Sequence, residues 1–279
     1  MELIEKYAEY LQNQGKAENT IQTYIGHVRR YMEWYQESFG EECAQLYRIN
    51  ILDYASYLQN IQKLEFSTIN NKLSALSSLN EFLVKSGVQE EVVLQANDYR
   101  KTQPLLVNPS DLSERDVQEF LQRVLVDTGT RNYAIAAILA YGGLRVSECI
   151  ALKRLDLDMT AMELRVIGKG RKKRIVYLND KIIHAVKVYL KERRSDSEYL
   201  FISRNGGKLH RSSVNRFFKS CSDTVTPHKL RHYFCSHALG DAGYSIAEVA
   251  NQAGHSDSRT TLRYTHPKRE QMKEKAKRL

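Results

Sequence analysis

Five side chains in this sequence could together attack a phosphodiester bond: those of Arg145, His228, Arg231, His255 and Tyr264. Guanidinium groups present planar N–H donors that suit phosphate oxygens, so two arginines can neutralise a pentacoordinate phosphate without a metal ion. Histidine side chains exchange protons near neutral pH, and a tyrosine hydroxyl can act as a nucleophile. These residue types together predict a phosphoryl-transfer enzyme with a tyrosine nucleophile.

Two of the five side chains are predicted to lie at helix ends. The apolar segment 131–141 should form a buried helix that the glycines at 142–143 break, so that Arg145 opens the next helix. A capping box starts a helix in segment 245–254, and the glycine at its end places His255 just beyond it. Both side chains are therefore expected where one element gives way to another.

Two more of the five are predicted to share one helix face. Thr226 before Pro227 combines a capping hydroxyl with a proline in the first turn, which together start a helix. His228 and Arg231, three residues apart, then point from the same side of that helix. Tyr264 should follow on a short helix or loop. Taken singly each residue is weak evidence, since Tyr264 is one of 17 tyrosines, but their order and spacing together support the prediction.

The composition indicates a packed protein without a metal or disulfide framework. The 279 residues are 42% hydrophobic, which is enough for one large domain or two ordinary ones. The N-terminus is charged at once, and no run approaches the ~20 apolar residues of a membrane span. We therefore expect a cytoplasmic protein, nucleoid-associated if it binds DNA. The four cysteines lack metal-ligand spacing, so no metal and no cofactor is expected.

The charge is divided unevenly along the chain. The net charge of +9 is the sum of −4 for residues 1–103 and +13 for residues 104–279. A strongly basic half predicts a polyanionic partner such as DNA. The alternative is a solvated basic surface with no such partner.

The first hundred residues predict a small bundle of amphipathic helices. Four apolar stripes at helical spacing lie at residues 3–11, 21–35, 52–58 and 69–83. The second helix is expected to start near Asn19 and Thr20, and the third near Asn50 and Asp53. Together these helices form a predicted N-terminal domain over residues 1–100.

A linker and a second domain are predicted to follow. Segment 101–110 contains two of the four prolines and little periodicity, and the net charge changes sign there. Within residues 111–279, alternating segments 163–167 and 174–178 predict a β-hairpin between helices. The predicted fold class is thus mostly α, with a helical N-terminal bundle and a mixed α+β C-terminal domain that contains a small hairpin or sheet.

Four segments resemble the motifs of the tyrosine recombinases, also called the phage-integrase family. Residues 142–148 (GGLRVSE) are close to the family's Thr-Gly-Leu-Arg-x-x-Glu, and residues 228–232 match His-x-Leu-Arg-His. Residues 254–266 match Gly-His-x-x-x-x-Thr-Thr-x-x-Tyr-x-His, and residues 168–174 match the lysine-bearing β-hairpin. The helical first half is similar to the family's SAM-like core-binding domain. Gly142 and Ala253 depart from the usual Thr and Leu, but neither is a catalytic group.

The resemblance implies a role for each of the five side chains. Tyr264 attacks the scissile phosphate, which leaves a 3′-phosphotyrosyl link and a free 5′-hydroxyl. Arg145 and Arg231 hold the non-bridging oxygens, and His255 donates a further hydrogen bond. His228 accepts the tyrosine proton. The phosphotyrosyl link conserves the bond energy, so neither ATP nor a metal is required.

Further residues are implied by the same resemblance. Lys169 is expected to protonate the departing 5′ oxygen, while Glu148 and His232 are supporting residues that orient the catalytic groups. The expected contacts to DNA are basic residues of the hairpin and of the N-terminal domain. They are Arg171, Lys172, Lys173 and Arg174, with Arg29 and Arg30 in the N-terminal domain.

The resemblance also implies partners and leaves alternatives. No extra module precedes the core-binding helices, which favours a Xer-type recombinase or a transposon cointegrate resolvase over a minimal integrase. Such an enzyme works as a homotetramer on two double-stranded recombination sites, through a Holliday junction, and its basic C-terminal tail contacts a neighbouring protomer. The alternatives are a type IB topoisomerase that relaxes DNA, and a non-catalytic DNA-binding regulator with the same fold.

Overall fold

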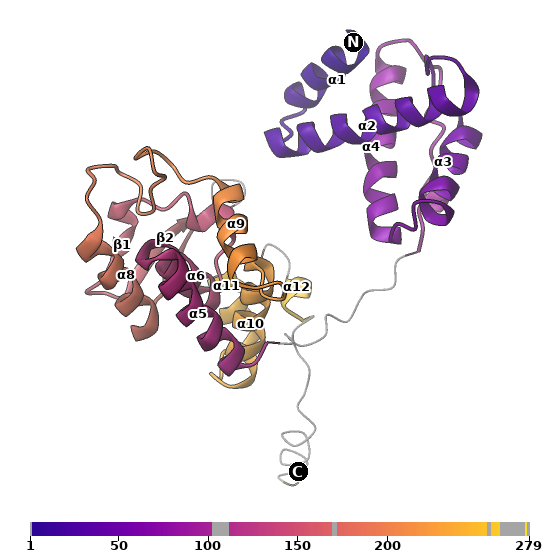
Figure 1. Ribbon diagram of the computed structural model, residues 1–279. Coiled ribbons are helices and arrows are strands. Elements are labelled where there is room, and N and C mark those ends of the chain that lie inside the picture. The colour runs from indigo at the N-terminus through magenta and orange to yellow at the C-terminus, as the bar shows by residue number, and fades with distance from the viewer. Residues whose placement is uncertain (1, 102–111, 169–171, 256–257, 263–276, 278–279) are drawn as a thin grey trace. The chain divides into compact units, whose positions relative to one another are not determined.

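The computed structural model describes residues 2–101, 112–168, 172–255, 258–262 and 277. The chain divides into two compact units, Met1–Leu105 and Leu106–Leu279 (Figure 1). The division lies inside the segment predicted as a linker, of which residues 102–110 are outside the described residues.

Unit 1 is built from helices alone within its described residues. They are α1 (Glu2–Asn13), α2 (Glu18–Phe39), α3 (Arg48–Asn60), α4 (Phe66–Lys85) and the 3₁₀ helix η1 (Ala96–Asp98). Helix α2 packs across α4, and the four long helices enclose one core. Three fully buried tyrosines, Tyr7, Tyr31 and Tyr54, lie in this core among leucine and isoleucine side chains. Aromatic rings therefore fill much of a small interior.

One helix of unit 1 begins earlier than the sequence predicts, and another begins one residue from its predicted start near Asn19 and Thr20. Helix α2 begins at Glu18 and α3 at Arg48, and neither has a capping side chain. At α3 a long-range contact fixes the start, because Arg48 forms a two-pronged ion pair with the buried Asp98 at 2.6 and 3.1 Å. The predicted start at Asn50 and Asp53 was wrong because this tertiary contact is not visible in the local pattern.

Unit 2 surrounds a buried central helix. Its long helices are α5 (Glu114–Thr128), α6 (Thr130–Gly142), α8 (Asp180–Glu192), α9 (Arg211–Cys221), α10 (Pro227–Gly240) and α11 (Ile246–Ala253). Shorter helices are α7 (Val146–Cys149), η2 (Arg154–Asp156) and α12 (Ser258–Leu262). Helix α6 packs against α5, α8 and α10, which explains why its alanine, isoleucine and leucine side chains are buried on every side. The predicted buried helix is confirmed.

A small antiparallel sheet completes unit 2. Strands β1 (Leu157–Asp158), β2 (Glu163–Ile167) and β3 (Lys173–Tyr177) pair in the order β1-β2-β3. The hairpin of β2 and β3 is confirmed, with Leu164 opposite Val176 on the buried face. Strand β1 and helix α9 were not predicted. A two-residue strand is too short to show an alternating pattern, so only its pairing with β2 identifies it.

The predicted helix starts of unit 2 are confirmed where a capping side chain defines them. Ser113 and Asp116 form a reciprocal capping box at α5, and Ser245 with Glu248 does so at α11. The Thr226 hydroxyl accepts a hydrogen bond from a backbone N–H of the first turn of α10. These bonds are local in sequence, which is why the pattern was sufficient to locate them.

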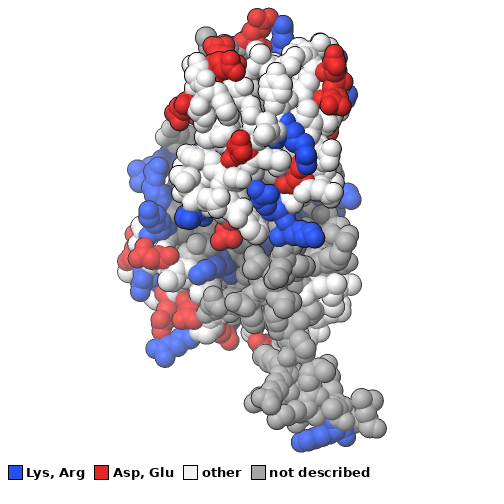
Figure 2. Space-filling model, turned by 90° about the vertical axis from the view of Figure 1, so that its right-hand side faces the viewer, with Lys and Arg blue, Asp and Glu red and all other residues white. Residues whose placement is uncertain are grey.

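The surface carries both signs of charge. On the face drawn in Figure 2, Lys and Arg side chains are interspersed with Asp and Glu side chains. Local clusters, rather than the net charge of a unit, therefore decide where an anion can bind. Among the described residues, no helix combines the length and the apolar character that crossing a bilayer requires.

Candidate active site

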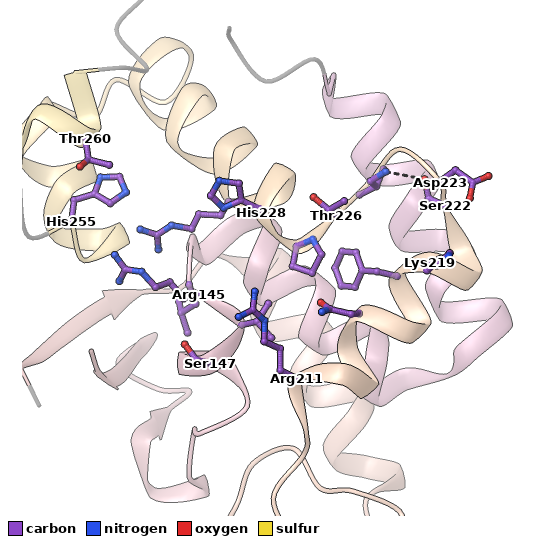
Figure 3. A pocket seen from close by; sticks show the side chains of 17 residues that line it. Arg145, Ser147, Arg211, Lys219, Ser222, Asp223, Thr226, His228, His255 and Thr260 are labelled. Atoms are coloured by element: carbon purple, nitrogen blue, oxygen red, sulfur yellow. Dashed lines mark hydrogen bonds between the residues drawn. The ribbon is translucent and has the colours of Figure 1, made fainter. Parts of the chain in front are cut away.

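Four of the predicted catalytic side chains line one cavity of unit 2. The cavity measures about 730 Å³ and is bordered by Arg145, His228, Arg231 and His255 (Figure 3). Arg145 lies at the start of α7, and His255 is the residue after α11. His228 and Arg231 both lie on α10. Three segments that are up to 110 residues apart in the chain thus contribute to one surface.

Arg145 reaches the cavity because the chain reverses sharply at Gly143. Gly143 has a φ of 66°, and a Cβ atom there would overlap the ring of Phe234. The next turn begins α7 with Arg145 at its N-cap. The Arg145 guanidinium is held by the Glu148 carboxylate at 3.0 Å and by the Gly254 carbonyl at 2.8 Å, with its side chain 40% exposed. It is therefore oriented, yet still accessible to a ligand.

Arg231 is almost completely buried. Its Nη1 atom donates to the Gly143 carbonyl at 2.5 Å and to the Ala253 carbonyl at 2.7 Å, and the residue is 6% exposed. Burial, followed by the nearby charge of Arg145, lowers the pKa of Arg231 to about 10. Two guanidinium groups held close together against their mutual repulsion create a site that favours an anion.

Glu148 partly balances these cations. Its side chain is 4% exposed, and its carboxylate accepts from the backbone N–H of Arg145 and from two guanidinium groups, those of Arg145 and Arg174. Burial alone would raise the pKa of Glu148, but the hydrogen bonds from Arg174 and from the Arg145 backbone hold it below its ordinary value. The carboxylate is thus ionised, and it is the acidic partner of the arginines.

His255 is held as a neutral imidazole. Gly254 ends α11 in the left-handed conformation, and His255 follows with its Nδ1 atom 2.7 Å from the Thr261 hydroxyl. Burial, then the positive charges of Arg231, Arg145 and Arg174, lowers the pKa of His255 to about 4. A neutral ring can donate one hydrogen bond to a phosphate without adding charge.

His228 and His232 form a pair on successive turns of α10. Their Nε2 atoms lie 2.7 Å apart and the rings meet edge to face. Partial burial and then Arg231 lower the pKa of His228, while burial and then His228 lower that of His232 to about 4. At neutral pH the N–H of one imidazole donates a hydrogen bond to the other ring, which restrains the orientation of both rings.

The structure corrects one predicted DNA contact. Arg174 was expected to bind phosphates with its hairpin neighbours, but its side chain is only 9% exposed and forms an ion pair with Glu148. Cross-strand pairing with Val166 turns Arg174 toward the interior of the unit. Lys172 and Lys173 are exposed, as DNA contacts must be. The run of basic residues concealed this difference because strand alternation places neighbours such as Lys173 and Arg174 on opposite faces.

Three predicted site residues lie outside the described residues. They are Lys169, Arg171 and Tyr264. Each belongs to a segment that adjoins a described part of the site, since β3 begins at Lys173 and α12 ends at Leu262.

The wall of the cavity that α9 provides was not predicted from the sequence. Arg211, Asn215 and Lys219 are spaced four residues apart on α9, and all three line the cavity. Their spacing, together with the apolar Val214 and Phe218 on another face, was the available signal for an amphipathic helix. The cavity therefore extends from the arginine pair along a polar helix face.

Unit 1 contains a second group of basic side chains. Arg29 and Arg30 are exposed on α2. Burial is the main cause that lowers the pKa values of His27 and Lys72. The positive charge of the nearby Arg30 lowers both pKa values further. Among the described residues no carboxylate forms an ion pair with any of these four side chains. An acidic unit thus contains a local basic cluster of His27, Arg30 and Lys72 on α2 and α4, whereas Arg29 lies beside Glu5, Glu33 and Glu42.

No group of three or more His, Cys, Asp or Glu side chains within the described ranges is arranged to hold a metal ion. The positive charge of the site comes instead from Arg145, Arg174 and Arg231.

This fold and this arginine–histidine site define a class of enzyme. Residues 110–271 match the Phage integrase family, and residues 3–90 match the phage-integrase N-terminal SAM-like domain. The chain belongs to the phage-integrase family of tyrosine recombinases, which break and rejoin DNA strands in site-specific recombination.

Individual relatives extend over nearly the whole chain. The TnP I resolvase of Bacillus thuringiensis is 45% identical over 281 residues, 99% of each chain. The tyrosine recombinase XerA of Thermococcus onnurineus is 34% identical over 274 residues, which cover 95% of this chain and 90% of the relative. Among solved structures, the Tn1549 transposon integrase in complex with a circular intermediate DNA has a TM-score of 0.71 at 19% identity, covering 99% of this chain and 98% of the other. That likeness shows the shared fold.

Proposed function

We propose that this recombinase cleaves DNA by attack of Tyr264 on a scissile phosphate, which forms a 3′-phosphotyrosyl link and frees a 5′-hydroxyl. Two successive strand exchanges then pass through a Holliday junction, on two double-stranded sites held by a homotetramer. The observation that carries the proposal is the convergence of Arg145, His228, Arg231 and His255 on one cavity.

The arginine pair supplies the charge that the transition state needs. The attacked phosphate gains negative charge as it becomes pentacoordinate, and Arg145 and Arg231 are already fixed by carbonyls and by Glu148. Donors that are fixed in advance need no reorganisation during reaction, which is the main source of electrostatic catalysis. The depressed pKa of Arg231 still leaves it cationic at neutral pH.

His255 and His228 have different tasks, namely a hydrogen bond to the phosphate and acceptance of the tyrosine proton. Nδ1 of His255 lies 2.7 Å from the Thr261 hydroxyl, and when this hydroxyl donates, the ring proton is on Nε2, where it can bond a phosphate oxygen. His228 accepts the tyrosine proton, and its partner His232 sets the ring orientation. Lys169 protonates the departing 5′ oxygen. The phosphotyrosyl link conserves the energy of the broken bond, so religation by the 5′-hydroxyl needs no ATP.

Resolution of paired sites is the favoured biological outcome. The relative with 45% identity over 99% of both chains is named a resolvase. We therefore propose that the enzyme recombines two short sites within one molecule, and that integration between molecules is the less favoured use of the same chemistry.

Unit 1 provides a second DNA contact in this proposal. Arg30 and Lys72 form a basic cluster with His27, to which duplex DNA supplies an anionic partner, and Arg29 is exposed next to Arg30 on α2. Burial and neighbouring charge lower the pKa values of His27 and Lys72, and a bound phosphate would raise them again.

Replacement of Tyr264 tests the chemistry. Tyr264→Phe removes only the attacking oxygen, so we expect no covalent protein–DNA adduct on a nicked suicide substrate, with binding affinity within about 2-fold of wild type. The readout is an SDS-resistant adduct in a gel, with duplex binding measured in parallel. An adduct formed by Tyr264→Phe would show that another residue is the nucleophile.

The target and the outcome are tested together. DNA trapped covalently by the wild-type protein is sequenced to obtain the site, and two copies are then placed in a supercoiled plasmid. Excision of the segment between directly repeated copies is the expected product. Relaxation without any joined product would instead support a type IB topoisomerase.

A further inference from the structure

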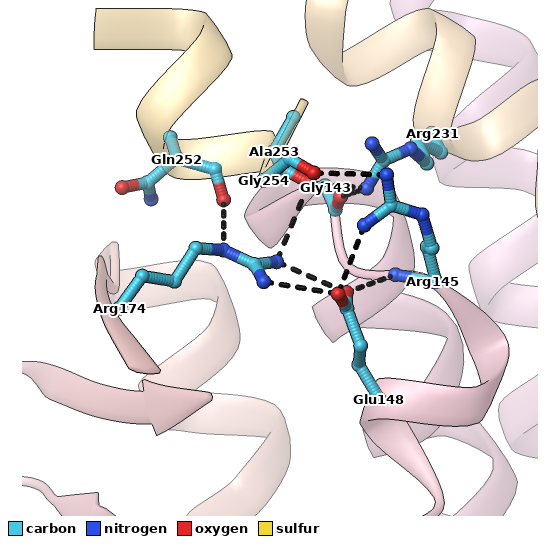
Figure 4. A network of polar contacts seen from close by, with 8 residues as sticks. All are labelled: Gly143, Arg145, Glu148, Arg174, Arg231, Gln252, Ala253 and Gly254. Atoms are coloured by element: carbon cyan, nitrogen blue, oxygen red, sulfur yellow. Dashed lines mark hydrogen bonds and ion pairs between the residues drawn. The ribbon is translucent and has the colours of Figure 1, made fainter. Parts of the chain in front are cut away.

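Arg174 is a buried arginine to which the proposed chemistry assigns no role. Its Nη1 and Nη2 atoms donate to the two oxygens of Glu148 at 2.9 and 3.0 Å (Figure 4). Its Nε atom donates to the Gln252 carbonyl at 3.1 Å, and Nη2 also reaches the Ala253 carbonyl at 3.4 Å. All three nitrogens of the guanidinium are thus engaged within the protein, and they join β3 to α7 and to the end of α11.

The end of α11 is where three arginines meet. The carbonyl of Gln252 accepts from Arg174, that of Ala253 from Arg174 and Arg231, and that of Gly254 from Arg145. The last carbonyls of a helix lack intrahelical donors and carry partial negative charge, so they attract guanidinium groups. Arg174 and the two proposed phosphate ligands therefore share one set of acceptors.

Glu148 is a second shared partner. Its carboxylate accepts four hydrogen bonds, two from Arg174 and two from Arg145. Without Arg174, both oxygens of a buried carboxylate would lose a donor, and the guanidinium of Arg145 would be the nearest replacement. Arg145 would then turn away from the cavity and toward Glu148.

Gly254 leaves the space that the Arg174 guanidinium occupies. A Cβ atom on Gly254 would lie 2.6 Å from Cζ of Arg174, closer than any real contact, and Gly254 has a φ of 69°. The glycine thus lets the guanidinium of Arg174 lie flat against the end of α11.

We infer that Arg174 is a positioning residue for DNA cleavage, which holds Glu148 and the end of α11 so that Arg145 points into the cavity. The inference rests on the proposed role of Arg145 at the scissile phosphate. Arg174 itself does not touch the DNA.

Salt dependence separates positioning from phosphate contact. Each phosphate contact contributes roughly 0.9 to the slope of log affinity against log salt concentration. Arg174→Gln should leave this slope unchanged, because Arg231 still pairs with the scissile phosphate when Arg145 is displaced. Lys173→Gln, one residue away and exposed, should reduce it. A reduction by Arg174→Gln equal to that of a phosphate contact would overturn the inference.

Single-turnover cleavage at saturating protein tests the coupling to Arg145. We expect Arg174→Gln to cleave a suicide substrate roughly 10²-fold more slowly, as expected when a catalytic group is displaced by about 1 Å. Arg145→Lys should also be slow, and the double variant should be no slower than Arg145→Lys alone, because Arg174 acts only through Arg145. Multiplied losses in the double variant, or a wild-type rate for Arg174→Gln, would refute the inference.

Arg165→Gln is the matched control. Arg165 lies on the neighbouring strand with its side chain on the opposite, exposed face, so its cleavage rate should equal that of wild type. A wild-type cleavage rate for Arg145→Lys would contradict the proposed function of Arg145. A wild-type rate for Arg174→Gln, with Arg145→Lys slow, would contradict only the positioning role of Arg174.

Folding of the variants is checked by calorimetry. If Arg174→Gln melts below the assay temperature, Arg174→Lys replaces it in both assays. A lysine keeps the positive charge beside Glu148 but cannot make the paired contacts of a guanidinium. We therefore expect the same slow cleavage and the same unchanged salt dependence for Arg174→Lys as for Arg174→Gln.

Discussion

At the scale of single residues, the site is an arrangement of charges that is complete only with an anion. Arg145 and Arg231 donate to neighbouring carbonyls at the end of α11, those of Gly254 and Ala253, while the Glu148 carboxylate that holds Arg145 also accepts from Arg174. Burial, and after it the positive charge of Arg145, lowers the pKa of Arg231. A phosphate in the cavity would offset the repulsion and restore the pKa toward its ordinary value.

Lys169 is the residue whose chemical role is easiest to isolate. Lys169→Ala should slow cleavage by about 10²–10⁴-fold, the usual contribution of a general acid, with much less effect on binding. A substrate with a 5′-bridging phosphorothiolate should restore cleavage to this variant, because a thiolate leaves without protonation. Cleavage rates on the two substrates are the measurement.

Arg145→Ala is the control for that experiment, since its defect is in charge stabilisation and the sulfur substrate should do little for it. Equal rescue of both variants, or rescue of neither, would show that Lys169 is only a basic residue near the phosphate.

At the scale of elements, the site depends on two glycines that end helices. Gly143 ends α6 and Gly254 ends α11, both with positive φ, and their carbonyls accept hydrogen bonds from Arg231 and Arg145 respectively. Each glycine is also crowded where a Cβ would be, by Phe234 and by Arg174. The turns therefore determine both the chain direction and the position of carbonyls that orient the arginines.

Gly143→Ala should be costly for this reason. Strain from the left-handed conformation costs about 1 kcal/mol, and overpacking against Phe234 adds about 1–3 kcal/mol. We expect the unfolding free energy of unit 2 to fall by the sum of these, measured by calorimetry. Gly206→Ala is the matched control, because Gly206 has a φ of 77° but nothing within 4 Å of the added atom, so only the conformational cost applies. Equal losses in both variants would contradict the packing argument.

At the scale of the whole molecule, stability is coupled to pH through two partly buried histidines. The pKa values of His232 and His255 are lowered to about 4 from an ordinary value of 6.5. Between about pH 4 and pH 6.5 these histidines bind more protons in the unfolded chain than in the folded chain. The free energy of unfolding therefore decreases as the pH falls through this range. Glu148, whose pKa lies below 4.5, adds a loss of the same sign at still lower pH.

The melting temperature should therefore be lower at pH 5 than at pH 7. In His255→Gln the ring that resists protonation is gone, so the difference between the two pH values should shrink. Calorimetric melts of the two proteins at both pH values measure this. A difference that is as large in His255→Gln as in wild type would show that other groups control the pH dependence.

Local chemistry accounts for what was predictable in this chain. The capping boxes at Ser113 and Ser245, the Thr226 cap and the apolar segment of α6 are all encoded within a few residues, and all are confirmed. The mostly α fold with a small sheet followed from the same periodic patterns. The roles of Tyr264 and of the other site residues remain predictions that mutagenesis must test.

Contacts between distant segments account for what was not predictable. The start of α3 depends on an ion pair between Arg48 and Asp98, fifty residues apart. The burial of Arg174 depends on strand pairing and on α11, 78 residues further along the chain. A basic run has the same appearance in the sequence whether its side chains face solvent or a buried carboxylate. Only the fold decides which guanidinium groups are available to DNA, because exposure and hydrogen-bond partners are set by packing and not by residue type.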